Sequence, residues 1–142
     1  MVGERTVSSR RRNGTNFSHV ITGVVDYARL TVVSVVVSDR AGWTVVTVSG
    51  DVDLATAPDL RSRLADLVAQ QPRVVVDLDG VDVIDSTGLG VLVGARRRAR
   101  QAGGDLVLVC AEGRVSDLLA SADLDRVFTI HRSLTEATGS AR

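Results

Sequence analysis

The sequence contains no lysine, one cysteine and two histidines, and each of these shortages excludes a class of site. Because all 17 basic residues are arginine, the chain cannot supply the lysine with which a P-loop holds nucleotide phosphates. The single cysteine, Cys110, cannot form an internal disulfide, and the apolar run around it favours a buried, inert thiol. His19 and His131 lie far apart in the sequence, so we expect neither a zinc site nor a bound cofactor.

Aromatic residues and long apolar runs are also scarce. Aromatics make up only 3% of the chain, which indicates an aliphatic core and argues against the stacking platforms that bind single-stranded nucleic acid. Residues 31–137 carry 11 arginines against 15 acidic residues, a net charge of −4 that disfavours contact with a phosphate backbone. No apolar run approaches the roughly 18 residues of a membrane span, and the N-terminus lacks the apolar stretch of a signal peptide. We therefore expect a cytoplasmic protein that binds neither nucleic acid nor membrane.

Composition divides the 142 residues into three parts. Residues 1–29 are polar and basic and show no periodicity over "VSSRRRNGTN", so we expect a flexible N-terminal extension, in which "HVITGVV" could form a short strand. Residues 30–138 carry the apolar patterns of one folded domain of ordinary size. Residues 139–142 form a short tail.

The domain begins with two Val- and Thr-rich strands joined by a short Gly-containing connector, a pattern that predicts an antiparallel hairpin. Helices and apolar strands then alternate with short links, which predicts a mainly parallel sheet. The fold class is therefore α/β: one domain with a mixed sheet, an N-terminal β-hairpin and about four helices. The expected strands span residues 30–38, 43–49, 73–79, 105–110 and 126–130. The expected helices contain residues 57–68, 86–102, 113–122 and 133–137.

Residues 85–90, "DSTGLG", follow a buried strand and open the second of these helices. Gly88, Gly90 and Gly94 give the spacing G-x-G-x-x-x-G, one residue longer than the dinucleotide-binding fingerprint, and about seven residues separate the strand from the helix. A nucleophile elbow requires G-x-S-x-G, but Ile84 stands in place of the first glycine. The motif thus disfavours both hydride transfer and hydrolysis, and we expect no enzymatic activity.

Two other interpretations of the motif are compatible with each other. Ser86 would be the N-cap, accepting a hydrogen bond from the backbone N–H of Gly88 or Leu89. Gly90 and Gly94 would let the helix lie close to the sheet. A cap alone does not call for two glycines in the first turn, each of which costs about 1 kcal/mol relative to alanine. The second interpretation is a switch, because a phosphoryl group on Ser86 would add roughly −1.5 to −2 charges at the open helix end.

From Leu30 to Ala137 the chain resembles the STAS domain of the anti-sigma factor antagonists. The resemblance rests on "VSGDVDLATAPDLRSRL", "VVVDLDGVDVIDSTGLGVLV", "RRARQAGGDLVLV" and "VSDLLASADLDRVFTI", which occur in the family's order and spacing. It implies that Ser86 is the phosphoacceptor, that Thr87 holds a position where the family has Ser or Thr, and that Asp53 is the acidic loop residue beside the phosphoacceptor. The compact members of the family lack the N-terminal extension.

The resemblance implies a binding module in a partner-switching circuit. The unphosphorylated protein would bind an anti-sigma factor of the serine kinase type and release the sigma factor. The kinase would phosphorylate Ser86 with its own ATP and Mg²⁺, and a metal-dependent phosphatase of the PP2C type would reverse this step. The alternative is a STAS module of a stress-signalling scaffold or of a transporter complex.

The residues expected to contact the partner are those of the motif and of the "GDVD" loop. If this loop lies beside the motif, Asp51 and Asp53 would repel a phosphate on Ser86. Four arginines late in the helix, at 96–98 and 100, suit its dipole as a solvated face, with contact to an acidic partner as the alternative. His131 is interpreted as a surface residue at a strand end rather than a ligand. The full set of expected partner-binding residues is Asp51, Asp53, Asp85, Ser86, Thr87, Gly88, Leu89 and Gly90.

Overall fold

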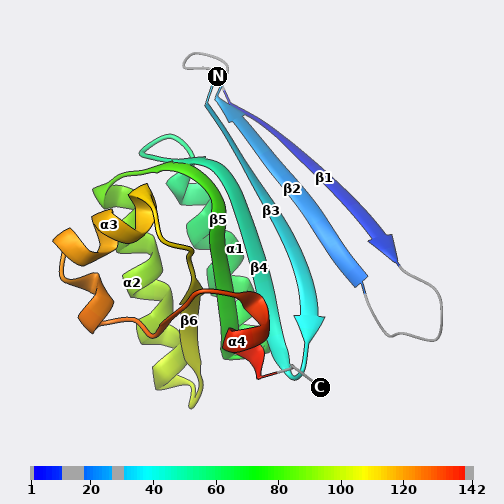
Figure 1. The fold of residues 1–142 in the computed structure, drawn as a ribbon. Coiled ribbons are helices and arrows are strands. Elements are labelled where there is room, and N and C mark those ends of the chain that lie inside the picture. The colour runs from blue at the N-terminus through cyan, green and yellow to red at the C-terminus, as the bar shows by residue number, and fades with distance from the viewer. Residues whose placement is uncertain (1, 11–17, 27–30, 140–142) are drawn as a thin grey trace.

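The computed structural model describes residues 2–10, 18–26 and 31–139 (Figure 1). Its strands are β1 (Val2–Arg10), β2 (Ser18–Asp26), β3 (Thr31–Arg40), β4 (Trp43–Val52), β5 (Arg73–Ile84), β6 (Asp105–Val109) and β7 (Ile130–His131). Its helices are α1 (Ala57–Gln70), α2 (Ser86–Gln101), α3 (Arg114–Ser121), the 3₁₀ turn η1 (Leu124–Arg126) and α4 (Leu134–Thr138).

The seven strands form one mixed sheet in chain order, from β1 to β7. Pairings up to β3–β4 are antiparallel, and those from β4–β5 to β6–β7 are parallel. The β3–β4 hairpin pairs Arg40 with Trp43, which leaves a two-residue turn of Ala41 (φ 53°) and Gly42 (φ 83°). Positive φ at both positions is what a type I′ turn requires. The predicted α/β class and hairpin are thus confirmed.

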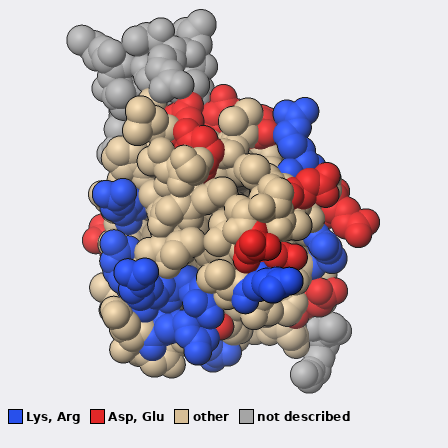
Figure 2. Space-filling view, turned by 90° about the vertical axis from the view of Figure 1, so that its left-hand side faces the viewer, with Lys and Arg blue, Asp and Glu red and all other residues tan. Residues whose placement is uncertain are grey.

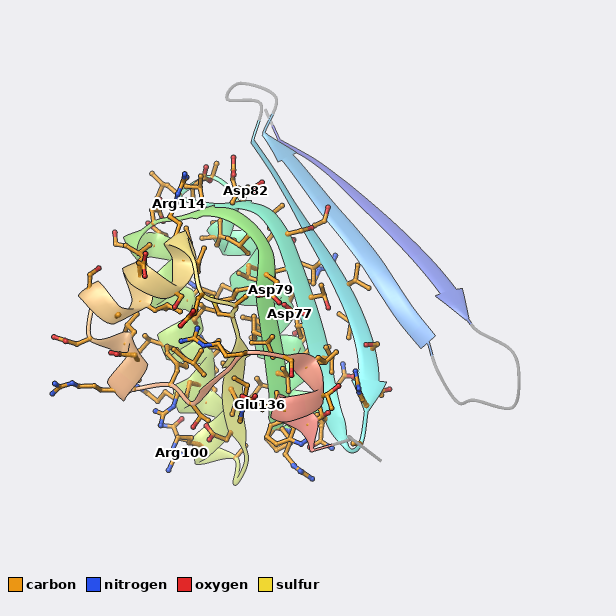
Figure 3. All side chains as sticks on the ribbon, viewed as in Figure 1. Asp77, Asp79, Asp82, Arg100, Arg114 and Glu136 are labelled. Carbon is orange, nitrogen blue, oxygen red and sulfur yellow. The ribbon has the colours of Figure 1, made fainter. Side chains whose placement is uncertain are left out.

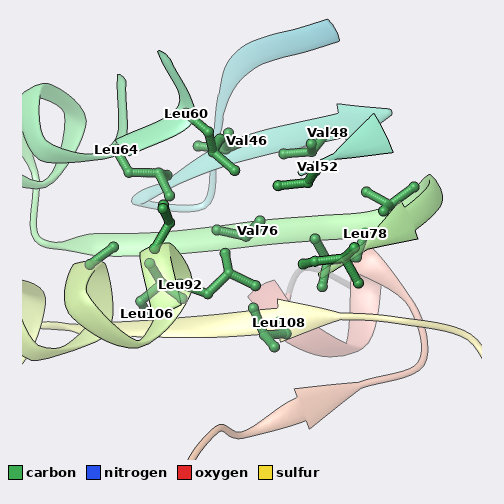
Figure 4. Packing of buried hydrophobic residues seen from close by; sticks show 14 of the residues in the cluster. Val46, Val48, Val52, Leu60, Leu64, Val76, Leu78, Leu92, Leu106 and Leu108 are labelled. Carbon is green, nitrogen blue, oxygen red and sulfur yellow. The ribbon is translucent and has the colours of Figure 1, made fainter. Parts of the chain in front are cut away.

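Three helices cover one face of the sheet. Because the parallel strands follow one another in chain order, right-handed crossovers bring α1, α2 and α3 to the same side (Figure 1). Leu60 and Leu64 of α1 and Leu92 of α2 are at most 1% exposed and meet Val76 and Leu108 of the sheet (Figure 4). This aliphatic layer is the main core, as the shortage of aromatic residues indicates.

The short helix α4 packs on the opposite face of the sheet (Figure 1). Its Ala137 joins Val45, Val75 and Val107 in a second, smaller buried cluster. The central strands are therefore covered on both faces, which explains the uninterrupted valines at 74–76.

Two strands lie inside the N-terminal segment for which we expected a flexible extension. β2 includes the "HVITGVV" stretch and pairs with β3, and β1 pairs with β2 along its whole length. Both extend the sheet past the domain's own hairpin through antiparallel pairing of consecutive strands, which the polar composition of this segment does not indicate. Residues 1, 11–17 and 27–30 of this segment lie outside the described residues, as do residues 140–142 of the predicted tail.

Two expected elements end at different residues in the structure. Residues 126–130 were expected to form a strand, but the chain makes the turn η1 and pairs with β6 only over Ile130–His131. Phe128 continues the turn by donating its N–H to Leu124 O (2.9 Å), and its side chain is buried against the helical layer. Conversely, β5 continues to Ile84 rather than ending at residue 79, so a single residue separates it from α2.

Candidate functional site

The ends of β4 and β5 bring together the two segments that the sequence singled out. Val52 pairs with Ile84 in the parallel ladder, and the Asp85 N–H donates to Val52 O at 3.1 Å. β4 then leads through the Asp53–Thr56 turn into α1, while β5 leads through Asp85 into α2. The "GDVD" and "DSTG" segments consequently lie side by side at the carboxyl edge of the parallel strands.

The N-cap of α2 is Asp85, and the predicted cap at Ser86 is wrong. Asp85 has extended backbone (φ −107°, ψ −176°), and its Oδ1 accepts the backbone N–H of Gly88 at 3.1 Å. The position of the cap is set by the end of β5, because the Asp85 N–H donates a hydrogen bond to Val52 O at the end of β4. Ser86 becomes the first residue of the helix and is exposed. Among the hydrogen bonds of the described residues, none involves its hydroxyl.

The glycines of the motif have roles different from those expected. A Cβ on Gly88 would lie 2.7 Å from Val52 Cγ1 and 2.8 Å from Ile84 Cγ1, so Gly88 is the residue that lets α2 approach the strands. At Gly90 and Gly94 a Cβ would meet nothing within 4 Å, so the role predicted for them is wrong. Gly90 lies one turn after Ser86 on the same helix face, and helical side chains tilt toward the N-terminus. Even a Cβ there would lie more than 4 Å from the Ser86 side chain, so Ser86 is not covered from this position.

Asp53 stabilises its own turn. The residue is only 7% exposed. Its carboxylate oxygen Oδ1 accepts hydrogen bonds from the backbone N–H groups of Ala55 (3.0 Å) and Thr56 (3.2 Å). The Thr56 hydroxyl accepts the Asp53 N–H at 3.0 Å and donates to Asp51 O at 2.8 Å. These bonds fix the loop beside the motif, and Thr56 itself makes no side-chain cap for α1.

Two exposed apolar residues beside the motif were missed by the sequence analysis. Leu54, 66% exposed, and Val83, 46% exposed, are the most exposed large hydrophobic side chains among the described residues. Leu54 follows Asp53 in the turn, and Val83 pairs with Asp51 in the ladder. A leucine placed outside the helical period in a polar loop is the signal that could have revealed the first.

The charge of this edge is acidic. Asp51 and Asp85 are partly exposed, and Asp82 is exposed just before Val83. Figure 2 shows acidic atoms along the upper edge of the face that it presents and arginines gathered near the lower end of that face. A phosphoryl group on Ser86 would therefore lie among carboxylates.

Other titratable groups lie away from the motif. Asp77 projects from β5 near Asp79 (Figure 3), and burial raises its pKa above the ordinary value. Burial also raises the pKa of the Cys110 thiol, with a further contribution from the negative charge of Asp79. His131 Nδ1 lies 3.4 Å from Glu136 Oε1.

No cofactor-like constellation occurs in the described ranges. Within residues 2–10, 18–26 and 31–139, no three His, Cys, Asp or Glu side chains come together as metal ligands. Over the same ranges, no helix has both the length and the apolar character to cross a membrane.

The chain is similar to known anti-sigma factor antagonists in sequence and in fold. The anti-sigma-B factor antagonist of Bacillus subtilis is 40% identical over 63 residues, 44% of this chain and 58% of that protein. The anti-sigma-F factor antagonist RsfB of Mycobacterium tuberculosis is 31% identical over 113 residues, 75% of this chain and 91% of that protein. The crystal structure of an anti-sigma factor antagonist from Mycobacterium paratuberculosis superposes with a TM-score of 0.70 at 29% identity, covering 78% of this chain and 94% of that one. The family model of the STAS domain matches residues 33–137, and the chain therefore belongs to the STAS-domain family.

Proposed function

We propose that this protein is a cytoplasmic anti-sigma factor antagonist, switched by phosphorylation of Ser86. The unphosphorylated form binds an anti-sigma factor of the serine kinase type and thereby frees the sigma factor. The protein is a binding partner and a kinase substrate, not an enzyme. The names of its relatives support the class of function, and the geometry around Ser86 supports the switch.

The observation that carries the proposal is the accessibility of the Ser86 hydroxyl. Asp85 provides the cap of α2, so the serine is not needed for that purpose. The side chain is exposed on the first turn, and Gly90 places nothing over it. A kinase active site can therefore surround this hydroxyl without unfolding the helix.

The surroundings of Ser86 suit protein docking. Leu54 and Val83 offer exposed apolar side chains near the serine, and Asp51, Asp82 and Asp85 supply negative charge around them. Interfaces obtain most of their affinity from a few buried anchors and their register from complementary charge. The surface fits a partner with an apolar pocket rimmed by cationic side chains.

Phosphorylation would then act on the complex rather than on the fold. The Ser86 oxygen attacks the γ-phosphorus of ATP, its proton passes to a base of the kinase, and ADP leaves. The product carries roughly −1.5 to −2 charges at the helix N-terminus, where the dipole tolerates them. A docked partner would have to desolvate this group beside existing carboxylates, which is costly. We expect the affinity to fall by about a hundredfold, equivalent to roughly 2.7 kcal/mol.

The reverse step requires a separate enzyme. A phosphatase of the PP2C type would hydrolyse the phosphoserine with its own metal ions, which restores the Ser86 hydroxyl and the docking surface. The two opposing enzymes then set the fraction of the protein that can bind the anti-sigma factor.

The test is incubation with the cognate kinase-type anti-sigma factor, ATP and Mg²⁺, read by intact mass and peptide mapping. One phosphate on Ser86 is expected, with none on Ser86→Ala. Thr87→Val is the matched control, because it alters the neighbouring hydroxyl and should leave phosphorylation intact. Phosphate on any other residue, or equal labelling of Ser86→Ala, would refute the switch.

Binding is measured separately. The unphosphorylated protein should retain the anti-sigma factor on an affinity column, and the phosphorylated protein should not. Recovery of a transporter ATPase from native lysate, with no kinase recovered, would instead identify a module of a transport complex.

A further inference from the structure

A second surface of the protein lies at the other end of α2. An open groove of about 500 Å³ runs between the last turns of this helix and the segment after η1. Arg97 follows Ser86 by eleven residues, so it lies about 16 Å further along the helix axis. The groove is thus distinct from the phosphorylation surface. We call it the arginine groove, and its lining residues are Val93, Arg96, Arg97, Arg100, Gln101 and Val127.

The arginine groove carries more positive charge than its surroundings neutralise. Asp105, at the start of β6, lies 3.8 Å from Arg96 Nε and 3.6 Å from Arg100 Nη1. One carboxylate therefore holds two guanidinium groups in place. Among the described residues, no carboxylate lies within ion-pair distance of Arg97, which is exposed. Figure 2 shows the arginines gathered on one part of this face, and Figure 3 places Arg100 at the end of α2.

The helix dipole explains only part of this arrangement. Cations in the last turn of a helix are stabilised by its negative end, and Arg98 and Arg100 occupy that turn. Arg96 and Arg97 precede the last turn, where the effect of the dipole has fallen off. Asp105 accounts for Arg96, so the charge of Arg97 is the one that needs another explanation.

Apolar side chains accompany the arginines. Val127 is 36% exposed and is one of three large hydrophobic residues exposed to this degree among the described residues. Val93 is half-buried on the α2 side of the groove. Arginine beside exposed apolar area is typical of protein interfaces. A free phosphate would use the arginines alone and leave the valines in water.

The net charge of the whole domain indicates which class of molecule can bind in the arginine groove. Residues 31–137 have a net charge of −4, so a nucleic acid seated on the arginine groove would be repelled by much of the remaining surface. A short protein segment meets only the local charge. We propose that the arginine groove binds an acidic segment of a partner protein, with its carboxylates on Arg97 and Arg100 and an apolar side chain against Val127.

The test uses fluorescence anisotropy with two labelled acidic peptides of equal length and charge. One has leucine at every third position among glutamates, and the other has serine in place of each leucine. The leucine peptide should bind more tightly. Arg97→Glu should weaken both peptides about tenfold, because it reverses a charge that no partner neutralises. Val127→Ser should weaken only the leucine peptide, by about three- to fivefold.

Two controls separate the arginine groove from general electrostatics and from the phosphorylation surface. Arg61→Glu changes an exposed arginine of α1 outside the groove and should have a clearly smaller effect than Arg97→Glu. Ser86→Ala should bind both peptides like the wild type. Equal affinity for the two peptides would overturn the proposal, as would equal effects of the two arginine variants. An oligonucleotide of matched charge that binds more tightly than the leucine peptide would also overturn it.

Discussion

Replacing Gly88 by alanine tests the contact that positions Ser86. The added methyl group would lie 2.7 Å from Val52 Cγ1, 2.8 Å from Ile84 Cγ1 and 3.1 Å from Val52 O. The last of these atoms is backbone and also accepts the Asp85 N–H at 3.1 Å. The strand end therefore cannot move away without weakening the hydrogen bond that places the helix cap.

Two opposing effects set the magnitude. Alanine is favoured over glycine inside a helix by about 1 kcal/mol. Overpacking of a tight site costs about 1–3 kcal/mol, and the upper part of that range applies where backbone must shift. We expect Gly88→Ala to lower the free energy of unfolding by about 1–2 kcal/mol, which corresponds to a fall in Tm of about 4–8 °C.

The assay is urea unfolding followed by circular dichroism, with Gly90→Ala as the matched control. Gly90 lies in the same helix, and a methyl group there meets nothing within 4 Å, so this variant should gain about 0.5–1 kcal/mol. The pair should thus shift in opposite directions. A Gly88→Ala protein as stable as the wild type would refute the argument that glycine is needed for this close approach.

Three further predictions concern single side chains. Asp85→Ala should lower the free energy of unfolding by about 1 kcal/mol, while Asp85→Asn keeps the capping oxygen and should lose much less; equal losses in urea titrations would contradict the capping role. Because burial raises the pKa of Asp77, the folded state holds this proton more tightly than the unfolded state does. The contribution of Asp77 to the free energy of unfolding is therefore fully present below its ordinary pKa and is lost as the pH rises through its raised pKa in the folded state. Asp77→Asn should consequently raise Tm relative to the wild type at neutral pH and not in acid; a difference independent of pH would count against this. Burial also raises the pKa of Cys110, so its thiol should react slowly with Ellman's reagent until urea unfolds the protein, whereas fast reaction of the native protein would show an accessible thiolate.

Helix α2 illustrates how far sequence reasoning extends. Its existence and its approximate ends followed from local pattern, and the structure confirms them. The same period could have revealed Gly88, because Gly88, Leu92, Ala95 and Ala99 form one buried stripe. The sequence analysis instead assigned the close approach to Gly90 and Gly94.

The choice of cap could not be made in the same way. Aspartate and serine are about equally good N-caps, so the order Asp85-Ser86 leaves the start of the helix open by one residue. The decision depends on where β5 ends, and β5 ends where Ile84 meets Val52 and the Asp85 N–H finds its acceptor. The accessibility of Ser86 follows from that contact with another strand.

The sequence by itself determined the α/β class, the aliphatic core and the hairpin, and through the family resemblance it predicts Ser86 as the phosphoacceptor. These features depend on residues near one another along the chain, whose period and turn chemistry act locally. Only the tertiary structure decided which residue caps α2, that Asp53 stabilises its own turn, that Leu54 and Val83 remain exposed, and that β1 and β2 extend the sheet. The cap of α2 depends on the contact between the ends of β4 and β5, and the exposure of Leu54 and Val83 depends on what the rest of the fold covers. The Asp53 turn and the pairing of β1 with β2 join residues close in the sequence, but the period and polarity of these segments do not specify which hydrogen bonds form there.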